Sequence, residues 1–263
     1  MIISISLGLF ILSVLLEMFV TNQKSVKLQA ALYNIQDNAK TAISILTDEI
    51  HQAGIMGCAR LSIGFPVTSF REYSFNRANR LVATSANEIM VRYAKYPNAS
   101  LEESMQNEMI IHANKTDHFA AGDILLISDC KQAEIFQAAN VRVKNGMQEI
   151  TASMPLHNKY EKFSEISHFI VNKFSITKTN RTHPDGSHVY SLFIEDINRN
   201  KIELVQGINQ MSMLFTINEA GEWRDVKQYE VNDWAQVAGV AIDLDVSEQA
   251  MKKTWHMYAV LNG

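Results

Sequence analysis

The sequence opens with MIISISLGLFILSVLLEMFV (residues 1–20), and this stretch decides the fold class. It contains no lysine or arginine, and Glu17 is its one acidic residue. A helix of about twenty apolar residues spans about 30 Å, the thickness of the hydrocarbon core of a bilayer. The core helix of a soluble domain shows a polar stripe, which is barely present here. We therefore interpret residues 1–20 as a membrane span.

A cleavable signal peptide is a poor alternative, because it needs a basic start and a small-residue cleavage site. Nothing basic precedes the apolar run, and EMFVTNQK (residues 17–24) comes at its end. Lys24 and Lys27 come after the span, which by the positive-inside rule disfavours export of the rest of the chain, although two lysines count for little. Either the topology is unusual or the chain begins inside a longer helix, and we expect the second.

The apolar pattern then narrows to one helical face. It recurs in steps of three and four at Leu28, Leu32, Ile35, Ala39, Ala42, Leu46, Ile50 and Ala53. This spacing predicts one helix from about residue 2 to residue 53, about 75 Å long, with Gly54 as its stop signal. Because TNQKS (residues 21–25) contains poor helix formers, a break there remains an alternative.

The remaining sequence is rich in β-branched and aromatic residues between turn signals, which predicts strands. The predicted strands are residues 87–94, 123–130, 133–143, 188–196, 201–218, 237–246 and 254–263, with turns at HPDG (183–186) and NRNK (198–201). Residues 206–211 could instead form a helical turn, and the turn-rich stretch 144–187 is expected to divide two small sheets.

The expected fold class is therefore α+β: a long N-terminal helix packed on an antiparallel β-sheet head. We expect three parts: residues 1–20 as the membrane-spanning half of the helix, 21–54 as its amphipathic half, and 55–263 as a β-rich head. The chain has 263 residues, 47% of them hydrophobic, and a net charge of −4. Since it has no basic excess, nucleic acid is not an expected partner.

Two cysteines, Cys58 and Cys130, are too few for a disulfide framework and show no zinc-ligand spacing. Outside the cytoplasm, one bridge between them is the natural interpretation. In a cytoplasmic protein they would be two buried thiols.

Motifs for catalysis, metal ions and cofactors are missing from the sequence. The eight histidines form no HExxH pattern, and no GxSxG, Walker or GxGxxG motif occurs. DINRNK (196–201) is similar to the front of a calcium loop but lacks the later glycine and glutamate, so a hairpin turn is the preferred interpretation and calcium the alternative. We predict no catalytic residue, no metal site and no cofactor, and we interpret the three tryptophans as core or edge residues.

Four segments carry a resemblance to a known family. They are SISLGLFILSVLLEMFVTNQ (4–23), DEIHQAGIMGCA (48–59), GDILLISDCKQAEIFQA (122–138) and IELVQGINQMSMLFTI (202–217). Together they resemble the PilW-type minor pilins of the type IV pilus assembly system. Such proteins begin with a basic leader ending in glycine, then an aromatic residue and a glutamate, none of which is present here. A truncated start or an alternative initiation codon would explain the difference.

The resemblance implies a non-enzymatic minor pilin that helps to initiate or assemble pilus filaments. Its expected partners are other minor pilins, the major pilin, the bacterial inner membrane and an adhesin at the pilus tip, with the head in the periplasm. On this interpretation a Cys58–Cys130 disulfide ties the helix exit to the sheet. The alternatives are a minor pseudopilin of a type II secretion system and a single-span periplasmic enzyme or sensor.

Filament assembly on this interpretation uses the apolar half of the helix. The expected packing residues are Ser4, Gly8, Leu12, Leu15 and Glu17. Ser4 and Gly8 stand four residues apart, the small-xxx-small spacing that permits close helix approach, although ordinary membrane-helix composition would explain them equally well. Glu17 is interpreted as a last-turn residue near the membrane surface, with a subunit contact as the alternative.

Overall fold

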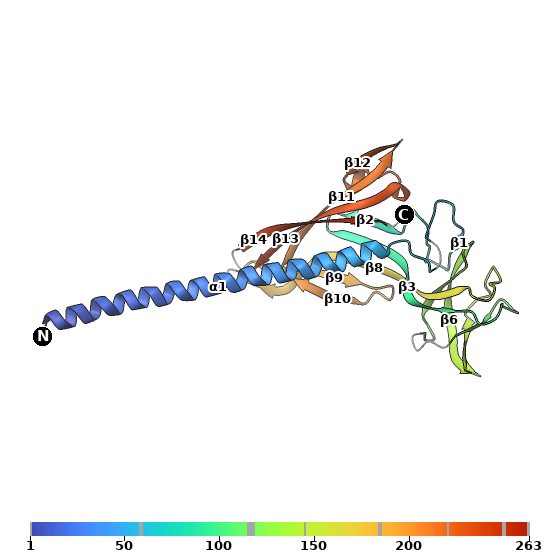
Figure 1. Cartoon of the computed structure of the whole chain (residues 1–263), viewed down its shortest axis with the longest axis horizontal. Helices are drawn as coiled ribbons and strands as arrows, with labels where there is room; N and C mark the ends of the chain where they lie inside the picture. Colours follow the sequence, from blue (N-terminus) through green and yellow to red (C-terminus); the bar gives the residue numbers. More distant parts are fainter. Residues whose placement is uncertain are drawn as a thin grey trace.

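The computed structural model consists of one long helix and a β-rich head (Figure 1). It describes residues 2–57, 60–114, 119–144, 146–183, 186–219, 221–248 and 251–261. The helix, α1 (Ile2–Gln52), projects from the head over its N-terminal half and lies against the head over its C-terminal half. This arrangement agrees with the expected α+β class.

The strands of the head form two sheets. The ten-stranded sheet has the order β10 (Lys201–Gln206), β9 (His188–Glu195), β8 (Glu165–Thr182), β5 (Ile124–Ser128), β6 (Ala133–Lys144), β7 (Met147–Ala152), β4 (Ile110–Ala113), with β1 (Val67–Thr68) on β6, β3 (Glu88–Ser100) on β8 and β2 (Leu81–Ser85) on β3. The four-stranded sheet has the order β12 (Glu222–Val226), β11 (Ile208–Glu219), β13 (Val237–Glu248), β14 (Met251–Val260). Two short 3₁₀ helices, η1 (Gln228–Glu230) and η2 (Trp234–Gln236), connect β12 to β13.

Helix α1 is continuous through residues 21–25, so the alternative of a break there is wrong. The predicted stop is confirmed: the helix ends at Gln52, and Gly54 adopts φ +85°, a left-handed conformation that glycine reaches without a Cβ clash. A Cβ at Gly54 would also approach Arg80 Cδ to 3.0 Å. The chain therefore needs glycine here for both backbone and space.

One face of α1 forms the centre of the main core. The buried helix residues are Ala31, Ile35, Ala39, Ala42, Leu46 and Ile50, and Ala53 is buried directly after the helix ends. All but Ala31 pack in one cluster with residues of β2, β3, β8 and β9 from the first sheet and of β11, β13 and β14 from the second. Leu28 and Leu32, which were expected to continue this face, are 52% and 37% exposed. Leu28 precedes Ala31, the first buried helix residue among those described.

The longest strand lies in the stretch that was expected to be turn-rich. β8 has eighteen residues and pairs with β3, β5 and β9, so it holds the ten-stranded sheet together. The expectation that residues 144–187 divide two sheets is wrong. Polar residues such as Asn172 and Ser175 interrupt the apolar alternation of β8 and obscure its strand pattern.

The two sheets divide at Gly207 instead. The predicted strand 201–218 is two strands, β10 and β11, in different sheets, and the alternative of a helical turn at 206–211 is wrong. Gly207 has φ +76°, and a Cβ there would lie 2.7 Å from the carbonyl oxygen of Ser247. A glycine is therefore required where the chain crosses between sheets.

Arg80 joins the end of α1 to both sheets. Its side chain is buried beside Gly54, it directly precedes β2, and its Nη2 donates to the carbonyl of Val237 at the start of β13 (2.9 Å). Burial, followed by repulsion from Arg77, lowers the pKa of Arg80 to about 10, so the guanidinium stays charged at neutral pH. A cation at a helix C-terminus interacts favourably with the helix dipole.

Glu49 is the acidic residue of α1 that faces the ten-stranded sheet. Its carboxylate accepts hydrogen bonds from Tyr93 of β3 (3.2 Å) and Asn172 of β8 (2.9 Å). Burial raises the pKa of Glu49, against the opposing effect of these two hydrogen bonds and of Lys95, while Asp48 adds to the rise. Apolar periodicity alone does not reveal this polar contact. The sequence signal for it is an acidic residue, Glu49, standing between Leu46 and Ile50 beside the apolar face of the helix.

The raised pKa makes the stability of the head depend on pH. Because the folded state holds the Glu49 proton more tightly than the unfolded state, the protonated carboxyl stabilises the head at low pH, and this contribution is lost as pH rises above about 4.5 through the folded pKa. We expect Glu49→Gln, which keeps hydrogen-bonding groups beside Tyr93 and Asn172, to remove this part of the pH dependence. The measurement is chemical denaturation across pH.

The matched control is Asp37→Asn, which changes an exposed acid of α1 that does not contribute to the raised pKa of Glu49. It should leave the pH profile close to that of the wild type. A Glu49→Gln variant with an unchanged pH profile, or one less stable than the wild type at neutral pH, would contradict the role of the half-buried carboxyl.

Candidate membrane and assembly surface

The N-terminal half of α1 exposes an apolar surface on every side. Large apolar residues more than 40% exposed are Leu7, Leu9, Phe10, Ile11, Leu12, Val14, Leu15, Leu16, Met18, Phe19 and Val20. This helix is long and apolar enough to span a membrane, and none of its most apolar window is buried. In water such a surface is unfavourable at about 25 cal/mol per Å² of apolar area. Lipid or other apolar helices around this surface would remove that cost.

The predicted packing residues lie on this free surface. Leu12 and Leu15 are 53% and 57% exposed, and an added Cβ at Gly8 meets nothing within 4 Å. Glu17 is exposed, and the side chain of Ser4 lies outside the described part of the structure. Gly8 has no side chain, and small residues of this kind permit close approach of helices in membranes.

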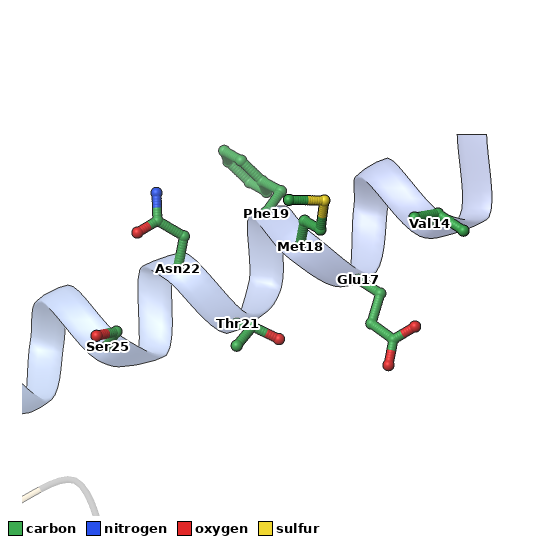
Figure 2. Close-up of a pocket in the computed structure, with 7 residues that line it drawn as sticks. All are labelled: Val14, Glu17, Met18, Phe19, Thr21, Asn22 and Ser25. Carbon is green, nitrogen blue, oxygen red and sulfur yellow. The ribbon is translucent and has the colours of Figure 1, made fainter. Parts of the chain in front are cut away.

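A shallow hollow runs along the end of the apolar stretch, lined by Val14, Glu17, Met18, Phe19, Thr21, Asn22 and Ser25. Figure 2 shows that all seven residues come from the single helix, with Glu17 and Thr21 on one side and Met18, Phe19 and Asn22 on the other. A hollow without an opposite wall holds no small ligand by itself. Its apolar lining with a few polar groups suits the boundary between lipid and water.

The hydroxyl of Ser13, in the middle of the apolar stretch, forms a hydrogen bond within the helix. Ser13 Oγ donates to the carbonyl oxygen of Phe10 at 2.8 Å. In hydrocarbon an unsatisfied hydroxyl costs several kcal/mol, whereas this local bond removes the need for an outside partner. Ser13 is therefore compatible with a lipid-facing position.

The two cysteines belong to neighbouring segments of the head. Ser128 Oγ donates to the carbonyl oxygen of Met56 at 2.7 Å, so the chain just before Cys58 lies beside the chain just before Cys130. A Cβ at Gly57 would lie 3.4 Å from Ser128 Oγ. Cys130 is exposed, and Cys58 lies outside the described residues, so the bridge stays a prediction. The contact between the flanking segments favours it.

We expect Cys58 and Cys130 to be joined in protein isolated from an oxidising compartment. A bridge closing a loop of about seventy residues is worth on the order of 4 kcal/mol in the chain-entropy model, and reduction should lower the free energy of unfolding by about that amount. The measurement is intact mass after thiol alkylation with and without reductant, followed by denaturation of both forms. Alkylation of both cysteines without reductant would show that no bridge forms.

Four histidines pair with carboxylates on the surface of the head: His112 with Glu103 and Glu149, His157 with Glu134, His168 with Asp123, and His256 with Asp243. The hollow of about 240 Å³ beside His112 is lined by Glu103, Glu149 and Lys144, among others. The pKa of Glu149 is lowered, first by its hydrogen bond to Arg142 and further by His112, while its desolvation acts in the opposite direction. These side-chain contacts tie strands and loops together. No group of three or more potential metal ligands occurs in the described ranges.

The calcium alternative at residues 196–201 is not supported by the geometry. Asp196 accepts hydrogen bonds from the backbone amides of Asn198 (2.8 Å) and Asn200 (2.9 Å), and from the Asn200 side chain (2.9 Å). Burial opposes ionisation of Asp196, but the bonds from Asn200 and Asn198 outweigh it and lower its pKa. The carboxylate therefore shapes the β9–β10 hairpin turn, as the preferred interpretation predicted.

Two tryptophans and two histidines of the head lie in the core, at a sheet edge or beside a turn. Trp234 packs edge-on against Phe215 of the core at 4.9 Å, whereas Trp223 is 63% exposed on β12 at the edge of the four-stranded sheet. His183 and His188 flank the β8–β9 turn, as expected. None of these residues marks a ligand site.

Comparison with known proteins adds no assignment. The sequence matches no protein-family model and no curated protein.

Proposed function

We propose that this chain is a non-enzymatic minor pilin of the PilW type, which helps to initiate or assemble type IV pilus filaments. In this proposal α1 anchors the protein in the bacterial inner membrane and the head lies in the periplasm. Other minor pilins and the major pilin are the partners. An adhesin at the pilus tip is a further proposed partner.

One observation supports this proposal: a single continuous helix is buried on one face by the head and is exposed from Leu7 to Val20, the described part of its apolar stretch. A membrane anchor alone needs no rigid connection to its head. A continuous helix fixes the head at a set distance and orientation from the apolar segment. Such a fixed geometry suits a subunit that repeats along a fibre through heterologous contacts.

The transfer from bilayer to filament requires little change in solvation. Lipid tails are as apolar as leucine, so helix association gains energy from close packing rather than from the hydrophobic effect. Gly8 permits close approach, and the exposed leucines Leu12 and Leu15 supply contact area. The head folds around residues 31–52 of α1, so the exchange need not disturb its core.

The direct test is deletion of the gene in its native host followed by imaging of surface pili. We expect fewer filaments, restored by the full-length gene supplied in trans. Membrane fractionation should place the protein in the inner membrane, and cross-linking should capture other pilins. Wild-type piliation in the deletion strain would contradict the proposal.

A point variant separates filament packing from membrane anchoring. We expect Gly8→Leu to reduce filament number severalfold, because the added side chain fills the space needed for close helix approach. The protein should still fractionate with the membrane at wild-type levels, since leucine favours insertion. The measurement is pilus counting with immunoblotting of membrane fractions.

The matched control is Ser13→Leu, which adds a similar side chain to another small residue on a different helix face. It should leave piliation unchanged. Equal loss in both variants would assign the defect to altered membrane insertion instead of to packing at Gly8.

A further inference from the structure

The solvent face of the four-stranded sheet carries a hollow of about 400 Å³. Its floor consists of two cross-strand pairs of β11 and β13, Leu214 with Ala241 and Ser212 with Asp243. Met213, between the two pairs on β11, has its side chain buried in the core, so the four floor residues point to the opposite side of the sheet. One half of the floor is therefore apolar and the other half polar. Ligand sites in proteins typically enclose about 300–1,000 Å³, and this hollow falls within that range.

Two turns form the walls of the hollow, and hydrogen bonds hold both in place. The first wall is η1, where the Lys227 amide donates to Glu230 Oε2 (3.0 Å) and the Glu230 amide donates to the Lys227 carbonyl oxygen (2.9 Å). The second wall is Ala86 in the β2–β3 turn. This turn is tied to β11, because Asn87 Oδ1 accepts a hydrogen bond from the Met211 amide (2.8 Å). The hollow is therefore formed before any ligand enters it.

Tyr229 presents an aromatic ring to solvent at this hollow. It belongs to η1, lines the hollow and is 71% exposed. Lys227 Nζ lies 6.0 Å from the ring centroid, at the outer limit of a cation–π contact. A tyrosine has few rotatable bonds, so covering its ring buries a large apolar area at a small cost in side-chain entropy. The ring is thus suited to serve as a flat platform for a ligand.

The polar groups that line the hollow are mixed in charge. Lys227 and Asp243 supply one positive and one negative group, and Ser212 and Gln228 supply neutral donors and acceptors. Asp243 Oδ1 pairs with Nδ1 of His256 at 2.6 Å. No other group in the described part of the chain bonds to Asp243 Oδ2, so this oxygen is available to accept a hydrogen bond. The lining therefore favours a neutral ligand whose groups both donate and accept.

We propose that this hollow binds a neutral saccharide, with one pyranose ring stacked on Tyr229. A pyranose ring has an apolar face of C–H groups and an edge of hydroxyls, each of which donates and accepts hydrogen bonds. Its apolar face matches Tyr229 and the Leu214–Ala241 pair. Its hydroxyls match the Ser212–Asp243 pair. The proposal concerns binding alone and requires neither membrane insertion of α1 nor filament assembly.

The test uses the full chain in phosphatidylcholine nanodiscs, which avoid sugar-based detergents, and saturation-transfer NMR. The probes are the methyl glycosides of glucose, galactose, mannose, N-acetylglucosamine and N-acetylgalactosamine, and the neutral peptide tetraglycine. We expect transfer to at least one glycoside and none to the peptide. Tyr229→Ala should weaken that binding by about tenfold, because the stacking surface is lost, whereas Tyr229→Trp should retain it.

The matched control is Trp223→Ala, which removes another exposed ring of the same sheet that does not line the hollow. Trp223 is 63% exposed, so neither alanine variant removes a core residue. The control should bind the glycoside with wild-type affinity. Absence of transfer to every glycoside, equal weakening in both alanine variants, or transfer to tetraglycine instead of the sugars would overturn the proposal.

This result and the test of the proposed function are separate. Wild-type piliation in the deletion strain would contradict the pilin proposal and leave the sugar-binding result as measured. A chain that binds no glycoside would overturn the saccharide site and leave the piliation result as measured.

Discussion

The whole structure depends on the way one helix divides its surface between two environments. From Ala31 to Ile50, α1 buries a narrow stripe of alanines, isoleucines and a leucine against two sheets. From Leu7 to Val20 the same helix buries nothing. Residues 2–52 contain no proline, and their one glycine, Gly8, lies near the start. Both halves are therefore parts of one continuous helix. The head is therefore held rigidly with respect to the apolar segment.

Two polar side chains fix where the sheets meet this helix. Glu49 bonds to β3 and β8, both in the ten-stranded sheet, and so sets the register of that sheet on α1. Arg80 links the end of α1 and the beginning of β2 to β13 in the four-stranded sheet. A polar side chain removed from water must find its partners in one arrangement, which apolar packing alone does not demand. These residues explain how a mostly alanine-lined helix face selects one docking geometry.

The sequence pattern was most informative where burial follows a simple period. The helix, its end at Gly54, and the strands β5, β6, β9 and β13 have patterns that local sequence displays clearly. It failed at β8, where Asn172 and Ser175 occupy buried positions because they meet polar or tightly packed partners. It also failed at 201–218, where a continuous apolar run conceals the sheet change at Gly207. Cross-strand partners decide both cases, and a single segment contains no information about them.

The amino-acid order by itself determined that the chain has a membrane-length apolar helix, a helical stop, a β-rich head and no recognisable catalytic motif. These features arise from local composition and periodicity, which act over a few residues. Only the tertiary structure decided that Leu28 and Leu32 stay outside the core and that the segments before Cys58 and Cys130 touch. Each of these depends on contacts between residues far apart in the chain, whose geometry is set only when both sheets close around α1.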